Sequence, residues 1–248
     1  EQSQGVVKLD EATRAQVLNQ LQADSVKLDA EQHSIAIDSA VKFAPDAYAK
    51  GYIIDRALVA ARQAVPSIEG LLVDIGGDIR VWGNAPQKEG WKIGVQDAFV
   101  HNDNSAPQQV LSLNDQAIAF SGQGYRTLAG QSHLLDPKTG MPLQQVEQCV
   151  VVGTCAADAD ALATALAAMT PSEGLALIET LIGYEAKVTL TDGQVHQSSC
   201  WNSLVEMPQH AEMRTVAASQ SSAKWPAGYQ AVIDLTIPKM DVEKYRAP

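Results

Sequence analysis

Short stretches of alternating apolar and polar residues and longer amphipathic stretches follow one another along this chain. Alternation is typical of strands with one buried face, and apolar spacing of three to four residues is typical of helices. The pattern predicts strands at 26–29, 35–38, 70–75, 91–95, 110–113, 117–121, 133–135, 149–152, 186–190 and 194–197. It predicts helices at 10–22, 47–63, 156–169 and 172–182. The two kinds of element are mixed without a regular βαβ order, which indicates the α+β class with mixed or antiparallel sheets packed by helices.

Cap and breaker residues support these boundaries. Asp10 precedes the first predicted helix as an N-cap, and Pro45 and Asp46 provide stop and cap signals before the second. Gly51 lies inside that second helix, where glycine costs about 1 kcal/mol relative to alanine. We therefore expect another part of the molecule, or a ligand, to approach the helix closely at Gly51.

The chain divides into three parts by composition. Residues 1–200 carry the regular pattern, whereas residues 201–224 are rich in Ser, Gln, Ala and Glu and are expected to form a linker. Residues 225–248 contain one more alternating strand, 229–237, which we interpret as the start of a C-terminal β domain. A lone strand cannot bury a core, so it would pair with the main domain or open a second one.

Charge and composition exclude several functional classes. With a net charge of -11 over 248 residues, the chain is unsuited to nucleic acid or anionic lipid surfaces as main partners. No run of about 18 apolar residues is present, so no membrane span is expected. The chain opens without an initiator Met, and we interpret it as processed or trimmed. Its three cysteines leave two possibilities open, one disulfide with a free thiol or three thiols.

Asp160 and Thr164 are the first candidates for chemistry. They are four residues apart in a predicted helix, so their side-chain oxygens lie on one face, about 6 Å apart at the Cβ atoms. A carboxylate and a hydroxyl so placed suit a hard cation such as Mg2+. The alternative is structural: Asp near a helix start stabilises the dipole, and a helical Thr commonly bonds a main-chain carbonyl.

Three other segments have a possible role and an ordinary alternative. Gly76-Gly77-Asp78 after a buried strand allows close approach of a ligand, or is a simple turn. Ser121-Gly122 ends another strand and is either a phosphate or ring-edge cradle or a flexible turn. His133 can act as a general base at neutral pH, although a lone strand histidine is more often a packed core residue. The sequence contains no Gly-x-Ser-x-Gly, Walker or His-Glu-x-x-His motif.

Five segments, in order, together resemble the ApbE family of flavin transferases. They are similar to the family's Ile-Ala-Lys-Gly-Tyr-Ala-x-Asp helix, its Gly-Gly-Asn/Asp strand end, its Ser-Gly, its Ser-His-Ile-Ile-Asp-Pro-Arg-Thr-Gly segment and its Ala-Asp-Ala-Leu-Ala-Thr-Ala-Leu helix. In this chain they are Tyr48–Asp55, Val73–Asp78, Ser121-Gly122, Ser132–Gly140 and Ala159–Leu166. The resemblance covers roughly residues 10–200.

The resemblance implies Mg2+-dependent transfer of FMN from FAD to a Thr or Ser of a partner protein, commonly a subunit of a bacterial electron-transfer complex, with release of AMP. It also implies a flavin cleft between subdomains and a periplasmic location, with a possible membrane anchor in the precursor. Carried over by position, the implied roles are metal binding for Ala47 (through its carbonyl), Asp160 and Thr164; catalytic base for His133; and FAD contact for Lys50, Asp55, Gly76, Gly77, Asp78, Ser121 and Gly122.

Two alternatives remain beside transfer. One is an FAD pyrophosphatase that uses the same site with water as the acceptor, and the other is a non-catalytic flavin-binding module. The second is favoured by two departures from the family. Ala44-Pro45-Asp46-Ala47 stands where the family has Asp-Leu-Gly-Gly, and an N-terminal portion of about a hundred residues is expected to be missing. The intact His133, Asp160 and Thr164 favour an enzyme.

Overall fold

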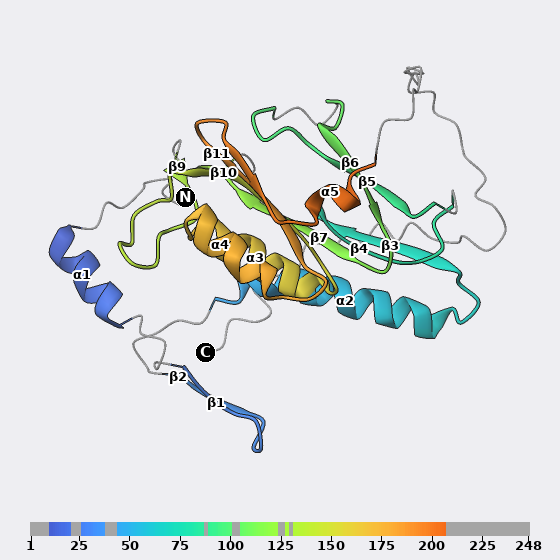
Figure 1. Ribbon diagram of the computed structural model, residues 1–248. Coiled ribbons are helices and arrows are strands. Elements are labelled where there is room, and N and C mark those ends of the chain that lie inside the picture. Colours follow the sequence, from blue (N-terminus) through green and yellow to red (C-terminus); the bar gives the residue numbers. More distant parts are fainter. Residues whose placement is uncertain are drawn as a thin grey trace, which may run out of the picture.

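The computed structural model describes residues 10–20, 26–37, 44–86, 89–100, 105–123, 127–128 and 131–206. The predicted strand at 229–237 and the C-terminal β domain lie outside these residues. A six-stranded sheet forms the centre of the described part, with strand order β12-β11-β10-β7-β4-β3 (Figure 1). All of its neighbouring strands are antiparallel.

The strands of this sheet come from widely separated parts of the chain. Their bounds are β3 Gly70–Ile75, β4 Asp78–Gly83, β7 Ala117–Gly122, β10 Val146–Gly153, β11 Glu185–Leu190 and β12 Val195–Gln197. Gly76 and Gly77 connect β3 to β4 with φ of 60° and 93°, a left-handed conformation that glycine adopts without strain. The turn with Asp192 and Gly193 connects β11 to β12, which pair antiparallel and correspond to the predicted strands 186–190 and 194–197.

Three helices cover one face of the sheet, and a second small sheet covers the other face (Figure 1). The helices are α2 Asp46–Ala64, α3 Ala156–Ala167 and α4 Pro171–Glu179. The opposite face carries the hairpin of β5 Trp91–Val95 and β6 Gln109–Leu113, together with the short helix α5 Trp201–Leu204. The α+β class predicted from the sequence is confirmed.

Strand β10 shows why its sequence is a continuous apolar run. Cys149 and Val151 pack with the helices on one face, whereas Val150 and Val152 pack with the β5–β6 hairpin on the other. All four side chains have no exposed surface, because side chains alternate between the two faces and both faces are covered. The sheet is therefore the middle of three layers.

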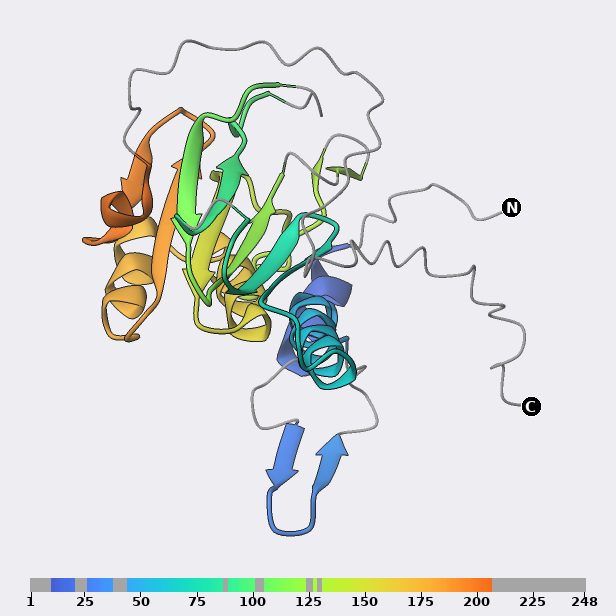
Figure 2. The ribbon, with the colours of Figure 1, turned by 90° about the vertical axis from the view of Figure 1, so that its right-hand side faces the viewer.

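Two elements lie outside this three-layer body. Helix α1 Glu11–Gln20 has no buried side chain and begins after Asp10, whose carboxylate accepts a hydrogen bond from the Thr13 N–H at 2.8 Å. The hairpin of β1 Val26–Asp29 and β2 Ser34–Ile37 projects away from the central sheet in both ribbon views (Figures 1 and 2). The predicted Asp10 cap and the predicted hairpin are both confirmed.

Two local predictions were wrong, and one strand of the central sheet was missed. Residues 133–135 do not form a strand; instead β8 Thr127–Leu128 pairs with β9 Gln131–Ser132, and His133 lies in a bend after β9. Asp46 does not cap α2 but belongs to its first turn, after Pro45. Strand β4 was not predicted because charged residues interrupt its apolar pattern.

The predicted linker also begins too early. Trp201 has no exposed surface and packs in the core between the sheet and the β5–β6 hairpin. Val205 forms a β-bridge with Leu111, and Glu206 forms a 2.8 Å ion pair with Lys92. Residues 201–206 therefore belong to the main domain.

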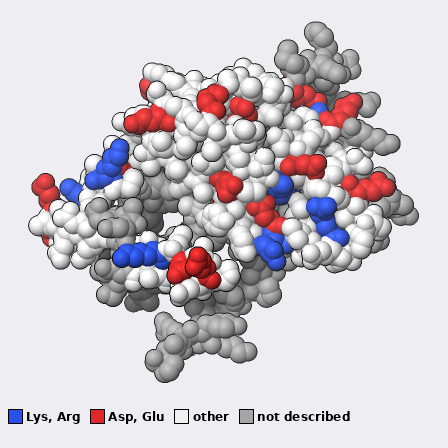
Figure 3. All heavy atoms as spheres, turned by 60° about the horizontal axis from the view of Figure 1, so that its bottom comes forward, with Lys and Arg blue, Asp and Glu red and all other residues white. Residues whose placement is uncertain are grey.

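All three cysteines are free thiols, which decides between the two possibilities left by the sequence. No helix in the described ranges combines the length and the apolar character needed to cross a bilayer. Lys and Arg side chains on the face seen in Figure 3 are interspersed with Asp and Glu rather than gathered into one basic patch.

Candidate active site

The candidate site forms where α2 and α3 touch. Gly51 of α2 is buried, and a Cβ atom at this position would lie 2.1 Å from the carbonyl oxygen of Ala156 and 2.7 Å from the Cα of Ala157. No side chain fits in this space, so glycine is required for the two helices to approach each other. The close approach predicted from Gly51 is confirmed, and the neighbour is α3.

Asp160 uses this contact to bind the main chain of α2. The N–H of Gly51 donates a 3.0 Å hydrogen bond to Oδ2 of Asp160, whose side chain is almost completely buried. A buried carboxylate needs partners for its charge, and main-chain N–H groups are suitable ones. The hydrogen bond from Gly51 fixes the orientation of this carboxylate through Oδ2.

Thr164 lies one helical turn beyond Asp160 and meets strand β7. Its Oγ1 lies 3.0 Å from Oγ of Ser121, within hydrogen-bond distance. The sequence predicted that Asp160 and Thr164 share a helix face, and both side chains indeed point towards the junction of α3 with neighbouring elements. Asp160, Thr164 and Ser121 therefore bring a carboxylate and two hydroxyl groups into one region.

A second buried carboxylate, Asp78 at the start of β4, lies near the first. Its Oδ2 forms a 2.7 Å ion pair with Nζ of Lys50, and its Oδ1 accepts a 3.1 Å hydrogen bond from the N–H of Phe120. Burial raises the pKa of the Asp78 carboxyl, the Lys50 ammonium lowers it, and the negative charge of Asp160 raises it further. The positive charge of Lys50 thus compensates the negative charge of Asp78, one of two neighbouring buried carboxylates.

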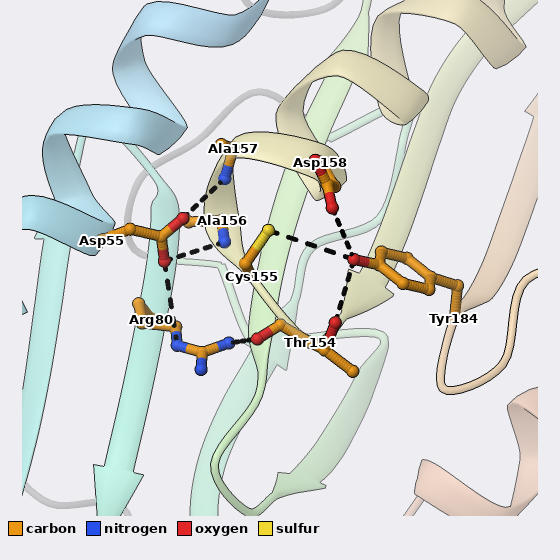
Figure 4. Close-up of polar contacts among 8 residues, drawn as sticks. All are labelled: Asp55, Arg80, Thr154, Cys155, Ala156, Ala157, Asp158 and Tyr184. Carbon is orange, nitrogen blue, oxygen red and sulfur yellow. Dashed lines mark hydrogen bonds and ion pairs between the residues drawn. The ribbon is translucent and has the colours of Figure 1, made fainter.

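Asp55, one turn beyond Gly51 on α2, binds the start of α3 (Figure 4). Its Oδ1 and Oδ2 each accept a 3.0 Å hydrogen bond, from the N–H groups of Ala156 and Ala157 respectively. These N–H groups have no partner within the helix, and a carboxylate placed here also stabilises the helix dipole. Asp55 is therefore the N-terminal cap of α3, supplied by another helix.

Arg80 and Tyr184 complete this network from either side (Figure 4). Nε of Arg80 lies 3.9 Å from Oδ1 of Asp55, and its guanidinium donates to the carbonyl of Thr154. The hydroxyl of Tyr184 donates to Asp158 at 2.9 Å and lies 3.0 Å from Oγ1 of Thr154. Burial raises the pKa of Tyr184 to about 12, so the phenol remains a proton donor at neutral pH.

The remaining residues with implied roles lie around these contacts. Gly76 and Gly77 are exposed, with nothing within 4 Å of where a Cβ would be, so their backbone is open to a ligand. Gly122 is buried, and a Cβ there would lie 2.1 Å from the carbonyl oxygen of Glu147. Gly122 is thus required for packing between β7 and β10.

His133 lies at the surface in the bend that follows β9. The segment after it is held by main-chain hydrogen bonds, including one of 2.9 Å from the Leu143 N–H to the Leu134 carbonyl. Asp136 closes the next turn, accepting bonds from the Lys138 N–H at 2.8 Å and the Thr139 hydroxyl at 2.9 Å. These contacts lower the pKa of the Asp136 carboxyl and fix the turn.

The donor set around Asp160 is compatible with Mg2+. In an α-helix each carbonyl points at the N–H group four residues later, so the carbonyl of Ala47 in α2 points at the N–H of Gly51. The same N–H group donates to Oδ2 of Asp160, so both oxygens lie beside it. No group of three or more His, Cys, Asp or Glu side chains in the described part of the chain could hold a metal ion. Mg2+ does not need such a group, since it is commonly held by one or two carboxylates together with substrate phosphates.

Comparison with known proteins agrees with this geometry. The family model for the ApbE family matches residues 2–188, which is most of the chain. The chain belongs to the ApbE family.

Two relatives in this family are named FAD:protein FMN transferase. The one from Vibrio cholerae serotype O1 is 35% identical over 137 residues, which cover 53% of this chain and 40% of that protein. The one from Treponema pallidum is 28% identical over 166 residues, which cover 62% of this chain and 45% of that protein. The chain thus spans less than half the length of these two relatives.

Solved structures of ApbE proteins share the fold. The ApbE protein of Thermotoga maritima superposes with a TM-score of 0.70 at 25% identity, covering 81% of this chain and 65% of that one. The flavin transferase ApbE from Vibrio cholerae superposes with a TM-score of 0.65 at 26% identity, covering 80% of this chain and 63% of that one.

Reasoning from the sequence missed Arg80, Thr154 and Tyr184. Arg80 was overlooked because an isolated arginine in an apolar stretch carries no spacing signal. Its partner Asp55 is 25 positions earlier in the printed sequence, and their proximity follows only from the fold. The ApbE resemblance supplied Asp55 with a ligand role, and the structure adds a role within the protein.

Proposed function

We propose that this chain carries the metal and FAD site of a flavin transferase, which moves FMN from FAD to a Ser or Thr hydroxyl of a partner protein and releases AMP. Membership of the ApbE family and the names of its relatives support this proposal. The observation that carries it is the buried carboxylate of Asp160, oriented by the N–H of Gly51 and accompanied by the paired hydroxyls of Ser121 and Thr164.

Mg2+ would be held by Asp160, Thr164 and the carbonyl of Ala47, with FAD phosphates as further ligands. Asp78 and Asp160 bring two buried negative charges together, and among the described residues only Lys50 forms an ion pair with either of them. A divalent cation offsets the remaining charge. When bound, it also neutralises charge at the pyrophosphate and on the departing AMP.

FAD would lie against the surface formed by the start of α2, the β3–β4 turn and the end of β7. Lys50 keeps about a third of its side-chain surface exposed while it binds Asp78, so its ammonium can also face an anionic ligand. The Gly77 N–H already donates to Oδ1 of Asp74 at 2.9 Å, but nothing crowds the backbone at Gly76 and Gly77, so a ligand can approach this turn closely. Asp78, Ser121 and Gly122 would support this surface from within.

His133 would act as the general base. It would take the proton of the acceptor hydroxyl as the hydroxyl oxygen bonds to the FMN phosphorus. The bond between that phosphorus and the bridging oxygen breaks at the same time, and AMP leaves with the oxygen. The exposed position of His133 is compatible with an acceptor that arrives on another protein.

The test is a titration of the purified chain with FAD, with and without Mg2+, following flavin fluorescence and AMP release. Binding with Mg2+-dependent AMP release supports a working site, and attachment of FMN to an added Ser- or Thr-containing acceptor then separates transfer from hydrolysis. FAD binding without AMP release would replace the proposal with a flavin-binding module. Absence of FAD binding would refute a flavin function for this chain.

A further inference from the structure

Helices α2 and α3 are connected at two points one helical turn apart. On α2 the two points are Gly51 and Asp55, which are four residues apart and lie on the same face. On α3 they are the N–H groups of Ala156 and Ala157 and, one turn later, the carboxylate of Asp160. Two connections fix both the rotation and the sliding of α3 against α2, which one connection cannot do.

The connection at Asp55 is further held by the sheet. Arg80 of β4 approaches Oδ1 of Asp55 and also binds the carbonyl of Thr154, in the turn that leads into α3 (Figure 4). Asp55 is only partly buried, but both of its oxygens point at α3 rather than at solvent (Figure 4). A residue that only contacted the flavin would not need to use both oxygens in this way.

The position of the Asp160 carboxylate depends on this arrangement. Its only described donor is the N–H of Gly51, which belongs to the other helix. A shift of α3 by a fraction of a turn would break that bond and release the Asp160 carboxylate from its orientation. The oxygens proposed to bind the metal therefore keep their geometry only while α3 stays in register with α2.

We infer that Asp55 is the positioning residue of the metal site: by capping α3 from α2, it holds the Asp160 carboxylate in the orientation that binds a divalent cation. This inference rests on the proposed function, because it concerns the same metal site. It assigns Asp55 to the support of the metal rather than to FAD contact. Arg80 supports the same arrangement indirectly, because it contacts both Asp55 and the carbonyl of Thr154 at the start of α3.

The test is a Mn2+ titration of the 248-residue chain, followed by the electron paramagnetic resonance signal of free Mn2+, with FAD affinity measured separately without metal. Loss of partners that orient metal ligands commonly lowers affinity about 10- to 100-fold. We expect Asp55→Ala to raise the Mn2+ dissociation constant by about this factor while the metal-free FAD affinity stays within about twofold. Asp55→Asn keeps one acceptor oxygen and should lie between Asp55→Ala and the wild type.

Thr170→Ala is the matched control, because it removes the capping box of α4, an N-terminal cap away from the metal site. It should lower the melting temperature without changing the Mn2+ dissociation constant. Wild-type Mn2+ affinity in Asp55→Asn or Asp55→Ala would overturn the inference, and so would a loss of metal-free FAD affinity in both variants. Failure of the wild-type chain itself to bind Mn2+ would refute the proposed metal site and the inference with it.

Discussion

The main-chain N–H of Gly51 donates a 3.0 Å hydrogen bond to Oδ2 of Asp160, although 109 positions separate the two residues. The bond joins the first turns of α2 to the second turn of α3. It fixes the orientation of the carboxylate through a main-chain group.

Asp160→Asn should abolish Mg2+-dependent AMP release from FAD while leaving the fold intact. The amide oxygen can still accept from Gly51, but the charge that attracts a cation is lost. The loss of metal affinity should exceed the roughly 10- to 100-fold that follows from loss of a supporting partner. The measurements are AMP release against Mg2+ concentration and a thermal unfolding curve. An unchanged rate would refute the metal role of Asp160.

His133→Ala should slow AMP release by about 100- to 10,000-fold, the usual contribution of a general base. FAD affinity, followed by flavin fluorescence, should be retained because His133 is proposed to act on the acceptor. His196→Ala, on β12, serves as a control and should leave both quantities unchanged. If FAD affinity is lost in His133→Ala, then His133 is a ligand contact or a structural residue rather than the base.

Gly51→Ala should destabilise the protein although alanine is the better helix former. The added Cβ would lie 2.1 Å from the Ala156 carbonyl oxygen, a main-chain atom that cannot move alone. Overpacking of this kind costs about 1–3 kcal/mol. Gly174→Ala in α4 is the matched control, since its Cβ would meet side-chain atoms of Leu166 and Met169, which can shift, rather than main-chain atoms. Urea unfolding measures both; equal losses in the two variants would contradict a special requirement at Gly51.

Trp201→Ala should lower the free energy of unfolding by about 3–5 kcal/mol, the usual cost of removing a fully buried aromatic side chain. Leu204→Ala in the same short helix removes a half-buried side chain and should cost less. Urea unfolding again provides the measurement. A loss below about 1 kcal/mol for Trp201→Ala is typical of surface positions. It would mean that Trp201 belongs to the linker predicted from the sequence and not to the core.

Cys200 should react with iodoacetamide before Cys149 at pH 7. Cys200 is exposed, whereas Cys149 is buried and burial raises its pKa to about 12. Only the thiolate reacts, and the raised pKa and the lack of exposed surface both hold back the reaction of Cys149. Peptide mass spectrometry should find Cys200 modified first and Cys149 only after denaturation. Equal labelling of the two in the folded protein would contradict the described burial.

Much of the fold could be predicted because the responsible signals are local. Short apolar runs identified β3 and β10, alternation identified β5, β6, β7, β11 and the strands of the β1–β2 hairpin, and apolar spacing identified all three helices that cover the sheet. The shared helix face of Asp160 and Thr164 follows from spacing alone. Gly51 also gave a usable signal, since a glycine inside a helix is unfavourable unless something packs against it.

The parts that could not be predicted depend on contacts between distant segments. Strand β4 contains Asp78 and Arg80, whose charges are compensated by Lys50 and Asp55 on α2. Without those partners in view, the charged residues argue against a buried strand. Trp201 lies in a polar segment whose composition is typical of a linker, and only its place beneath the β5–β6 hairpin makes it a core residue.

The long separation between the two helices of the site also affects how the protein acquires its function. Bringing α2 and α3 together closes a loop of about a hundred residues, and contacts of this kind form late because the loss of chain entropy precedes any gain. That loop contains the central strands β3, β4, β7 and β10. Helix α2 packs on β3 and β4, and α3 packs on β7 and β10. Metal and FAD would therefore find their site only on a chain whose sheet is already assembled. Their binding would in turn stabilise that state by mass action, so ligand supply would influence how much of the newly made protein stays folded.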